Sequence, residues 1–455
     1  SRGRGNLSST ANPYFLFPQI YNFRYNIYSS EWPVANRAIE LYLQKKSENE
    51  GWERQINGLS NNEKANLLLE KHTFKELLAD VEQRNLQNNI VGLEASRLFA
   101  RSEINMGVDA FRDSLYAMLK RNTFLNIKFE NMLDTLGEMS RTDLYSYLKE
   151  WEQLTPLPFY SIGEPELTKV VNKGGEEFFV LKVLVSNNSD YDGIIQMNVL
   201  QNGWWYQPME DPRARKKVEI AAHTSKEFVS VWEEQIRDVE INTMVSGNLP
   251  YMIRQSIGNV KQERNKIVKD TIYTLPESSL EMPGEVIVDN EDSTLFVLST
   301  PAVVGLLPKW LDKVEDTSFK YSGISWWRAP LQWTATTNAK YYGKYIRSAY
   351  VIKSGDGSQT ATWKIPVPEA GQYELYYHVF KDDELRWNDR LQGEYHFRVA
   401  YDSEMEDAYI NLRKANEGWE QLGTYYFSAD TVRVVLTDEC KLRSVTADAV
   451  KIVKR

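Results

Sequence analysis

The sequence predicts a multidomain α+β protein in which an N-terminal helical domain precedes two antiparallel β-sandwich domains. The chain has 455 residues, and one hydrophobic core rarely serves more than about 250–300 residues. Apolar residues recur at helical spacing in the first third of the chain and at every second position from Glu176 onward. We therefore expect domains at residues 1–155, 156–283 and 284–455.

The first of these regions carries helix start signals followed by apolar stripes. Residues 60–63 (SNNE) and 73–76 (TFKE) fit the capping box, in which a serine or threonine and a glutamate three positions later bind each other's backbone amides. Further along, apolar residues repeat at steps of three and four: Val108, Phe111, Leu115, Met118 and Leu119. These patterns predict a helical domain.

Short alternating runs replace the helical pattern after the Thr155–Tyr160 junction. They alternate apolar and polar residues and are separated by turn residues such as Asn188 and Gly193. The runs cover residues 176–187, 193–200, 216–223, 225–234 and 237–244. They predict an Ig-like antiparallel sandwich of about 100 residues. Residues 258–283 are polar and weakly patterned.

The last region, residues 284–455, alternates again and predicts a jelly-roll-like sandwich of about six to eight strands. The alternation places Trp363, Tyr373 and Tyr377 on the core face of two of these strands. The alternate positions of the second strand fall on its opposite face: Glu374, Tyr376, His378 and Phe380.

Two aromatic segments of this region, residues 325–333 (SWWRAPLQW) and 340–345 (KYYGKY), lack strand periodicity. Exposed loop aromatics often bind ligands. A tryptophan or tyrosine ring can cover the C–H face of a sugar while an arginine binds the hydroxyl groups. The residues suited to this task are Trp326, Trp327, Arg328, Trp333, Tyr341 and Tyr342. The alternative is a loop that buries its own aromatic side chains on the sandwich.

Composition and charge exclude several classes of protein. The net charge is −9 and no basic patch is visible, so we predict no nucleic-acid partner. The longest apolar run, residues 178–186, contains a lysine and is too short to span a bilayer. The single cysteine, Cys440, leaves no partner for a disulfide within the chain. The chain begins without a signal peptide, so we expect a mature chain or a piece of a longer one.

No self-contained active site or metal site is visible in the sequence. The four histidines show no H-E-x-x-H or other close metal-ligand spacing, and G-x-S-x-G and phosphate-loop motifs are absent. The acidic segments 289–292 (DNED) and 381–384 (KDDE) lack the order of a calcium loop and are interpreted as solvated turns. We therefore predict no catalytic residue, no metal and no cofactor.

Residues 90–160 contain a series of amphipathic helical patterns, and Trp151, Pro158 and Tyr160 lie where it meets the first β region. This series resembles the C-terminal side of the catalytic domain in zinc aminopeptidases of the aminopeptidase-N (gluzincin) family. That family binds zinc through H-E-x-x-H and a later glutamate, and this chain has neither. Residues 84–93 contain no tyrosine where the family has its catalytic one. The resemblance therefore carries over no catalytic residue.

The C-terminal region carries several short motifs in order: Tyr341-Tyr342-Gly343, then residues 361–379, 418–427 (GWEQLGTYYF) and 447–453 (ADAVKIV). This series resembles the golvesin C-terminal-like domain, which is also found on xanthan lyases. The resemblance implies a β-sandwich accessory module that binds glycan in secreted or envelope proteins, chiefly of bacteria.

Together the two resemblances are typical of envelope proteins of Bacteroidetes-type bacteria. We predict a non-catalytic binding or scaffolding protein of the periplasm or cell surface, with a polysaccharide or an envelope protein as partner. One alternative is the downstream part of a zinc aminopeptidase-like protein, which stoichiometric zinc in the pure chain would favour. The other is the soluble part of a transporter-like membrane protein, with membrane-spanning segments upstream in the full gene product.

Overall fold

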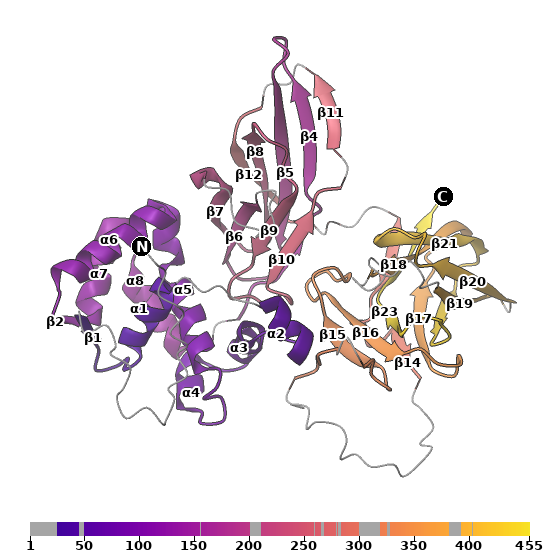
Figure 1. Cartoon of the computed structure of the whole chain (residues 1–455), viewed down its shortest axis with the longest axis horizontal. Coiled ribbons are helices and arrows are strands. Elements are labelled where there is room, and N and C mark those ends of the chain that lie inside the picture. The colour runs from indigo at the N-terminus through magenta and orange to yellow at the C-terminus, as the bar shows by residue number, and fades with distance from the viewer. Residues whose placement is uncertain are drawn as a thin grey trace. The chain divides into compact units, whose positions relative to one another are not determined.

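The computed structural model describes residues 25–44, 50–154, 156–200, 211–258, 260–264, 268–278, 280, 284–299, 319–324, 328–381, 393–402 and 404–455. The described part is a mixed α+β fold with several antiparallel sheets, as the sequence predicts (Figure 1). Contacts divide the chain into two compact units, residues 1–45 with 94–152 and residues 46–93 with 153–455. The three domain boundaries stay a prediction. Across the described residues, no helix has the length and apolar character needed to cross a bilayer.

The unit formed by residues 1–45 and 94–152 is mainly helical. Its elements are β1 (Tyr25–Tyr28), α1 (Ala35–Leu43), the greater part of α5 (Gln87–Met106), α6 (Val108–Arg121), β2 (Leu125–Lys128), α7 (Phe129–Ser140), α8 (Leu144–Lys149) and the 3₁₀ turn η1 (Glu150–Glu152). Strands β1 and β2 pair in parallel. The predicted apolar face of α6 is confirmed at Phe111, Leu115 and Leu119, which are buried, while Val108 and Met118 are partly exposed.

Three short helices, α2 (Glu50–Asn57), α3 (Asn61–Leu69) and α4 (Phe74–Ala79), begin the second unit. Both predicted capping boxes are confirmed, with Ser60 and Thr73 as the N-caps of α3 and α4. Between α2 and α3, Gly58 has a φ of +80°, and a Cβ there would lie 2.4 Å from the backbone of Ser322. Only glycine fits this close approach.

Two sheets enclose one apolar core in the first β region of this unit. One sheet has the order β11-β4-β5-β8-β12, with β3 added along β5, and the other has the order β10-β9-β6-β7. The strands are β3 (Tyr160–Ile162), β4 (Glu166–Val171), β5 (Glu177–Asn187), β6 (Gly193–Leu200), β7 (Arg215–Ile220, after the 3₁₀ turn η2, Pro212–Ala214), β8 (Thr224–Trp232), β9 (Asp238–Asn242), β10 (Met252–Ser256), β11 (Val260–Arg264) and β12 (Thr271–Pro276). The core contains Leu181, Val183 and Phe228 from the larger sheet and Ile195 and Val239 from the smaller one. The predicted sandwich architecture fits this pair of sheets, and its Ig-like assignment stays a prediction.

The weakly patterned residues 258–283 contain two strands that the sequence did not predict. Strand β11 pairs in parallel with β4, and β12 pairs antiparallel with β8, so they lie at the two edges of the larger sheet. Most residues of both strands are partly or fully exposed. An edge strand that buries so little carries almost no hydrophobic alternation, which explains why the pattern missed it.

A second pair of sheets encloses the core of the C-terminal region. The orders are β13-β24-β18-β21 and β14-β17-β22-β19-β20, with a further sheet β15-β16-β23. The strands are β13 (Glu285–Val288), β14 (Phe296–Leu298), β15 (Thr334–Thr337), β16 (Ser348–Lys353), β17 (Thr360–Pro366), β18 (Gly371–Val379), β19 (Glu394–Tyr401), β20 (Glu404–Asn411), β21 (Gly418–Phe427), β22 (Thr431–Thr437), β23 (Ser444–Ala447) and β24 (Val450–Lys454). The region therefore has more strands than predicted, because elements as short as β14 and β15 show too few alternations to be recognised. Its jelly-roll-like assignment stays a prediction.

The predicted core positions of this sandwich are confirmed. Trp363 and Tyr377 are fully buried and Tyr373 is 1% exposed. Their rings pack against neighbouring aromatic residues: Trp363 lies 5.3 Å from Phe296, and Tyr377 lies 5.0 Å from Phe397 between ring centroids. The strand alternation thus correctly separates core aromatic residues from those on the outer face.

In the first sandwich, an exposed histidine predicts a pH-dependent stability. His223 Nε2 lies 2.8 Å from Asp190 and Nδ1 lies 2.7 Å from Glu277, and these hydrogen bonds raise the pKa of His223 above its ordinary value of 6.5. A raised histidine pKa gives stability that is fully present below about pH 6.5 and is lost as the pH rises through the folded-state pKa. We expect the melting temperature of the wild type to fall across this window, and that of His223→Gln to fall less. Parallel melting curves of the two proteins across that window would contradict this.

Candidate functional site

The structure places the six predicted ligand residues in different surroundings. Trp326 and Trp327 lie outside the described residues. Arg328 is exposed. Trp333 is partly buried against the core of the C-terminal sandwich, and its indole Nε1 has no hydrogen-bond partner among the described residues. Its position fits the alternative in which part of the loop packs on the sandwich.

The two adjacent tyrosines differ from each other. Tyr341 is only 6% exposed, and its ring packs 4.7 Å from that of Phe380. Tyr342 is partly exposed, and its ring lies 5.0 Å from Trp419 and 5.8 Å from His378. Tyr342 therefore belongs to a group of rings on the surface of the sandwich, whereas Tyr341 supports the loop from beneath.

This group lies on the outer face of the sheet β13-β24-β18-β21. Tyr376 and His378 alternate with the core residues of β18, and His378 is directly opposite Trp419 on β21. The rings of His378 and Trp419 meet edge to face at 5.1 Å. We call Tyr342, Tyr376, His378 and Trp419, together with Lys451, the aromatic face.

Lys451 of β24 adds a positive charge to the aromatic face. It is directly opposite Tyr376 in the sheet, and its Nζ lies 4.8 Å from the ring centroid of Trp419 and 5.4 Å from that of Tyr376. The same Nζ lies 2.8 Å from the carboxylate of Glu285 on β13. An ammonium held between two rings and a carboxylate has few rotamers left, so it is ordered before a ligand arrives.

A buried carboxylate holds the aromatic face together from below. Asp448 is fully buried, accepts a hydrogen bond from the Tyr342 amide at 3.2 Å, and lies 2.9 Å from His378 Nδ1. Its own carbonyl accepts a hydrogen bond from the Trp363 indole at 3.2 Å. Asp448 thus connects the loop of Tyr342, the ring of His378 and the core.

The electrostatics of this carboxylate follow from its burial. Burial raises the pKa of Asp448 above its ordinary range, and the interactions with His378, the Tyr342 amide and Arg347 oppose that rise. Burial also lowers the pKa of Arg347 to about 10, so its guanidinium stays charged at neutral pH. The Arg347 side chain is fixed by a hydrogen bond of 2.8 Å to the carbonyl of Ala339. Asp448 is therefore suited to positioning its neighbours.

The sequence prediction named only Tyr342 among the residues of the aromatic face. It placed Tyr376 and His378 on the outer face of their strand without assigning them a role. Trp419 and Lys451 lie on strands far apart in the sequence, and only the register of the sheet brings them next to Tyr376 and His378. The short motifs at 418–419 (GW) and 447–450 (ADAV) were the sequence signals that could have drawn attention to Trp419 and Lys451.

The aromatic face combines ring surfaces with a fixed cation and a nearby carboxylate. Its four rings are all partly exposed, so a ligand can reach them. Rings suit the C–H faces of sugars, and Lys451, whose side chain is 12% exposed beside the rings, can donate to hydroxyl oxygens. Within the described part of the chain, no three histidine, cysteine or acidic side chains converge as metal ligands would.

Comparison with known proteins identifies the C-terminal region. Residues 327–454 match the family described as Golvesin C-terminal domain, and this range includes every residue of the aromatic face. No curated protein matches the chain. The family match covers this domain only.

Among solved structures, a Bacteroides uniformis β-glucuronidase is similar over 69% of this chain and 31% of its own, with 11% identity and a TM-score of 0.19. Legionella pneumophila aminopeptidase A is similar over 40% of this chain and 18% of its own, with 16% identity and a TM-score of 0.20. The chain thus spans less than a third of either protein.

Proposed function

We propose that this chain is a non-catalytic binding protein of the bacterial envelope and that its golvesin C-terminal domain binds polysaccharide through the aromatic face. The observation that carries the proposal is the grouping of the rings of Tyr342, His378 and Trp419 on one outer sheet face, with Lys451 over the rings of Trp419 and Tyr376. Support also comes from the domain type, which is typical of extracellular and envelope proteins.

Each part of the aromatic face has a task in this proposal. Tyr342 and Trp419 cover the C–H faces of sugar rings, and Lys451 binds hydroxyl or carboxylate oxygens. Asp448 and Tyr341 do not contact the ligand but hold the loop of Tyr342 in place. Because these groups are held before binding, little rotamer entropy is lost when the ligand arrives.

The affinity is expected to be weak for a single repeat of the polysaccharide. Stacking of one ring contributes about 1 kcal/mol beyond its buried area. A few such contacts give a dissociation constant on the order of 0.1–1 mM. A long polymer offers many repeats, so binding is best measured with the polymer itself.

Affinity electrophoresis in gels that contain soluble bacterial polysaccharides tests this proposal. We expect at least one polysaccharide to retard the wild-type chain, and Trp419→Ala and Tyr342→Ala each to raise the dissociation constant roughly fivefold, the equivalent of about 1 kcal/mol. Tyr409→Ala is the matched control, because Tyr409 is 57% exposed on β20 of the other sheet. Equal retardation of all variants, with unchanged melting temperatures, would place the binding elsewhere.

A further inference from the structure

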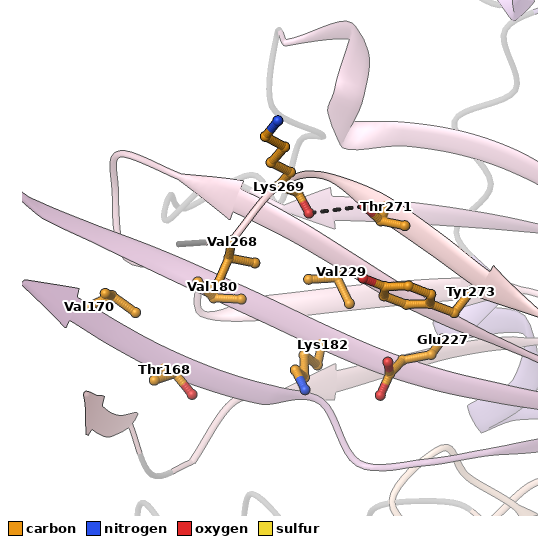
Figure 2. Close-up of a pocket in the computed structure, with 10 residues that line it drawn as sticks. All are labelled: Thr168, Val170, Val180, Lys182, Glu227, Val229, Val268, Lys269, Thr271 and Tyr273. Atoms are coloured by element: carbon orange, nitrogen blue, oxygen red, sulfur yellow. Dashed lines mark hydrogen bonds between the residues drawn. The ribbon is translucent and has the colours of Figure 1, made fainter. Parts of the chain in front are cut away.

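A pocket of about 450 Å³ lies on the outer face of the larger sheet of the first sandwich, whereas the aromatic face belongs to the C-terminal sandwich (Figure 2). Strands β4, β5, β8 and β12 line it with residues that alternate with core residues such as Leu181 and Phe228. Volumes of about 300–1,000 Å³ are usual for small-molecule sites.

One end of the pocket is apolar. Val170, Val180 and Val229 are 0%, 3% and 4% exposed, although they lie on the face of the sheet that points away from the core. Val268, from the connection between β11 and β12, packs against them and also lines the pocket. These valines form a small apolar cluster of their own, which gives an apolar group of a ligand a surface to contact.

The other end carries two opposite charges. Figure 2 shows Lys182, Glu227 and Tyr273 toward one end of the pocket and Val170 and Val180 toward the other. Lys182 is directly opposite Val229, and Glu227 is directly opposite Leu184, so the two charged residues are diagonal neighbours on β5 and β8. Among the described residues, neither side chain has an ion-pair or hydrogen-bond partner.

We infer that this pocket binds a free α-amino acid with an apolar side chain, such as leucine. Lys182 binds the α-carboxylate, Glu227 binds the α-ammonium group, and the valine end contacts the side chain. The two charges of an α-amino acid are adjacent, as Lys182 and Glu227 are in the sheet. Tyr273, 49% exposed, closes the charged end with its ring.

Other small ligands fit this arrangement less well. A fatty or keto acid would leave Glu227 without a partner and would place a carboxylate beside it. An apolar amine would leave Lys182 without a partner and would place an ammonium group beside it. A neutral sugar has no alkyl side chain for the valine end and no charge for Lys182 or Glu227, and burial of unpaired charge or of unmatched apolar surface costs affinity.

Isothermal titration of the full chain with three matched probes tests the inference. The probes are L-leucine, 4-methylpentanoate, which lacks the ammonium group, and 3-methylbutylamine, which lacks the carboxylate. We expect L-leucine to bind, and each analogue to bind about tenfold more weakly or worse, because each loses one charged hydrogen bond. No heat from L-leucine up to about 10 mM, or equal binding of all three probes, would overturn the inference.

Two variants connect the result to the pocket. Lys182→Met is expected to weaken the binding of L-leucine about tenfold and to leave the binding of 3-methylbutylamine unchanged. Glu227→Gln is expected to weaken the binding of L-leucine about tenfold without weakening that of 4-methylpentanoate. Lys216→Met on β7, outside the pocket, is the control and should bind L-leucine like the wild type. Melting curves verify that each variant is folded. If neither pocket substitution changes the affinity for L-leucine, then L-leucine binds elsewhere on the protein.

Discussion

Replacing Trp363 with alanine is expected to destabilise the C-terminal sandwich by roughly 3–5 kcal/mol, the usual cost of deleting a large buried aromatic side chain. The side chain is fully buried, packs against Phe296 and Tyr377, and donates a hydrogen bond to the Asp448 carbonyl. Its loss leaves a cavity between the two sheets. Hydrogen exchange of peptides from β17 and β18, followed by mass spectrometry, measures the local free energy of unfolding.

Tyr426→Ala is the matched control for this substitution. Tyr426 is an aromatic residue of the same sandwich but is 65% exposed. Removing it should change the free energy of unfolding by about 0.5 kcal/mol or less, as is usual for surface positions. Similar losses from the two substitutions would mean that Trp363 is not a core residue.

Replacing Asp448 with alanine is the second change with a large expected effect. The Tyr342 amide would lose its acceptor and His378 Nδ1 its hydrogen-bond partner, both in a partly buried setting. Leaving a buried polar group without a partner costs about 1–3 kcal/mol, so two such groups predict a loss of about 3 kcal/mol or more. Because the loop of Tyr342 would also be released, we expect polysaccharide binding to fall even at temperatures where the domain stays folded.

Asp448→Asn separates hydrogen bonding from charge. An asparagine can still accept from the Tyr342 amide and offers His378 an amide partner, so we expect a loss of about 1 kcal/mol, that of one altered hydrogen bond. Denaturant titration of both variants measures the difference. If alanine and asparagine cost the same, the carboxylate is not the anchor of the Tyr342 loop.

The sequence predicts much of the fold because burial leaves a periodic signal. In β18 the period of two assigned Tyr373 and Tyr377 to the core and Tyr376 and His378 to the outer face. The capping boxes at Ser60 and Thr73 similarly predicted the starts of two helices. The signal fades where a strand buries little on either face, as in the edge strands β11 and β12.

The candidate site was less accessible to sequence analysis. Loop aromatic residues were recognised as a class, but the sequence did not distinguish the buried Tyr341 from the partly exposed Tyr342. Trp419 lies opposite His378 only because β18 and β21 pair in one particular register, which includes an irregularity between Leu375 and Tyr376. A single sequence specifies the faces of a strand but not which residues of another strand will lie beside it.

Hydroxyl-radical footprinting of the wild-type chain, with and without a polysaccharide that retards it in gels, tests the central claim most directly. Oxidation of each aromatic side chain is measured by mass spectrometry of its peptide. If the aromatic face binds the polymer, Trp419 and Tyr342 will be protected while Tyr409, on the other sheet, will be oxidised as before. Protection of other residues, with Trp419 and Tyr342 unchanged, would contradict the proposed site.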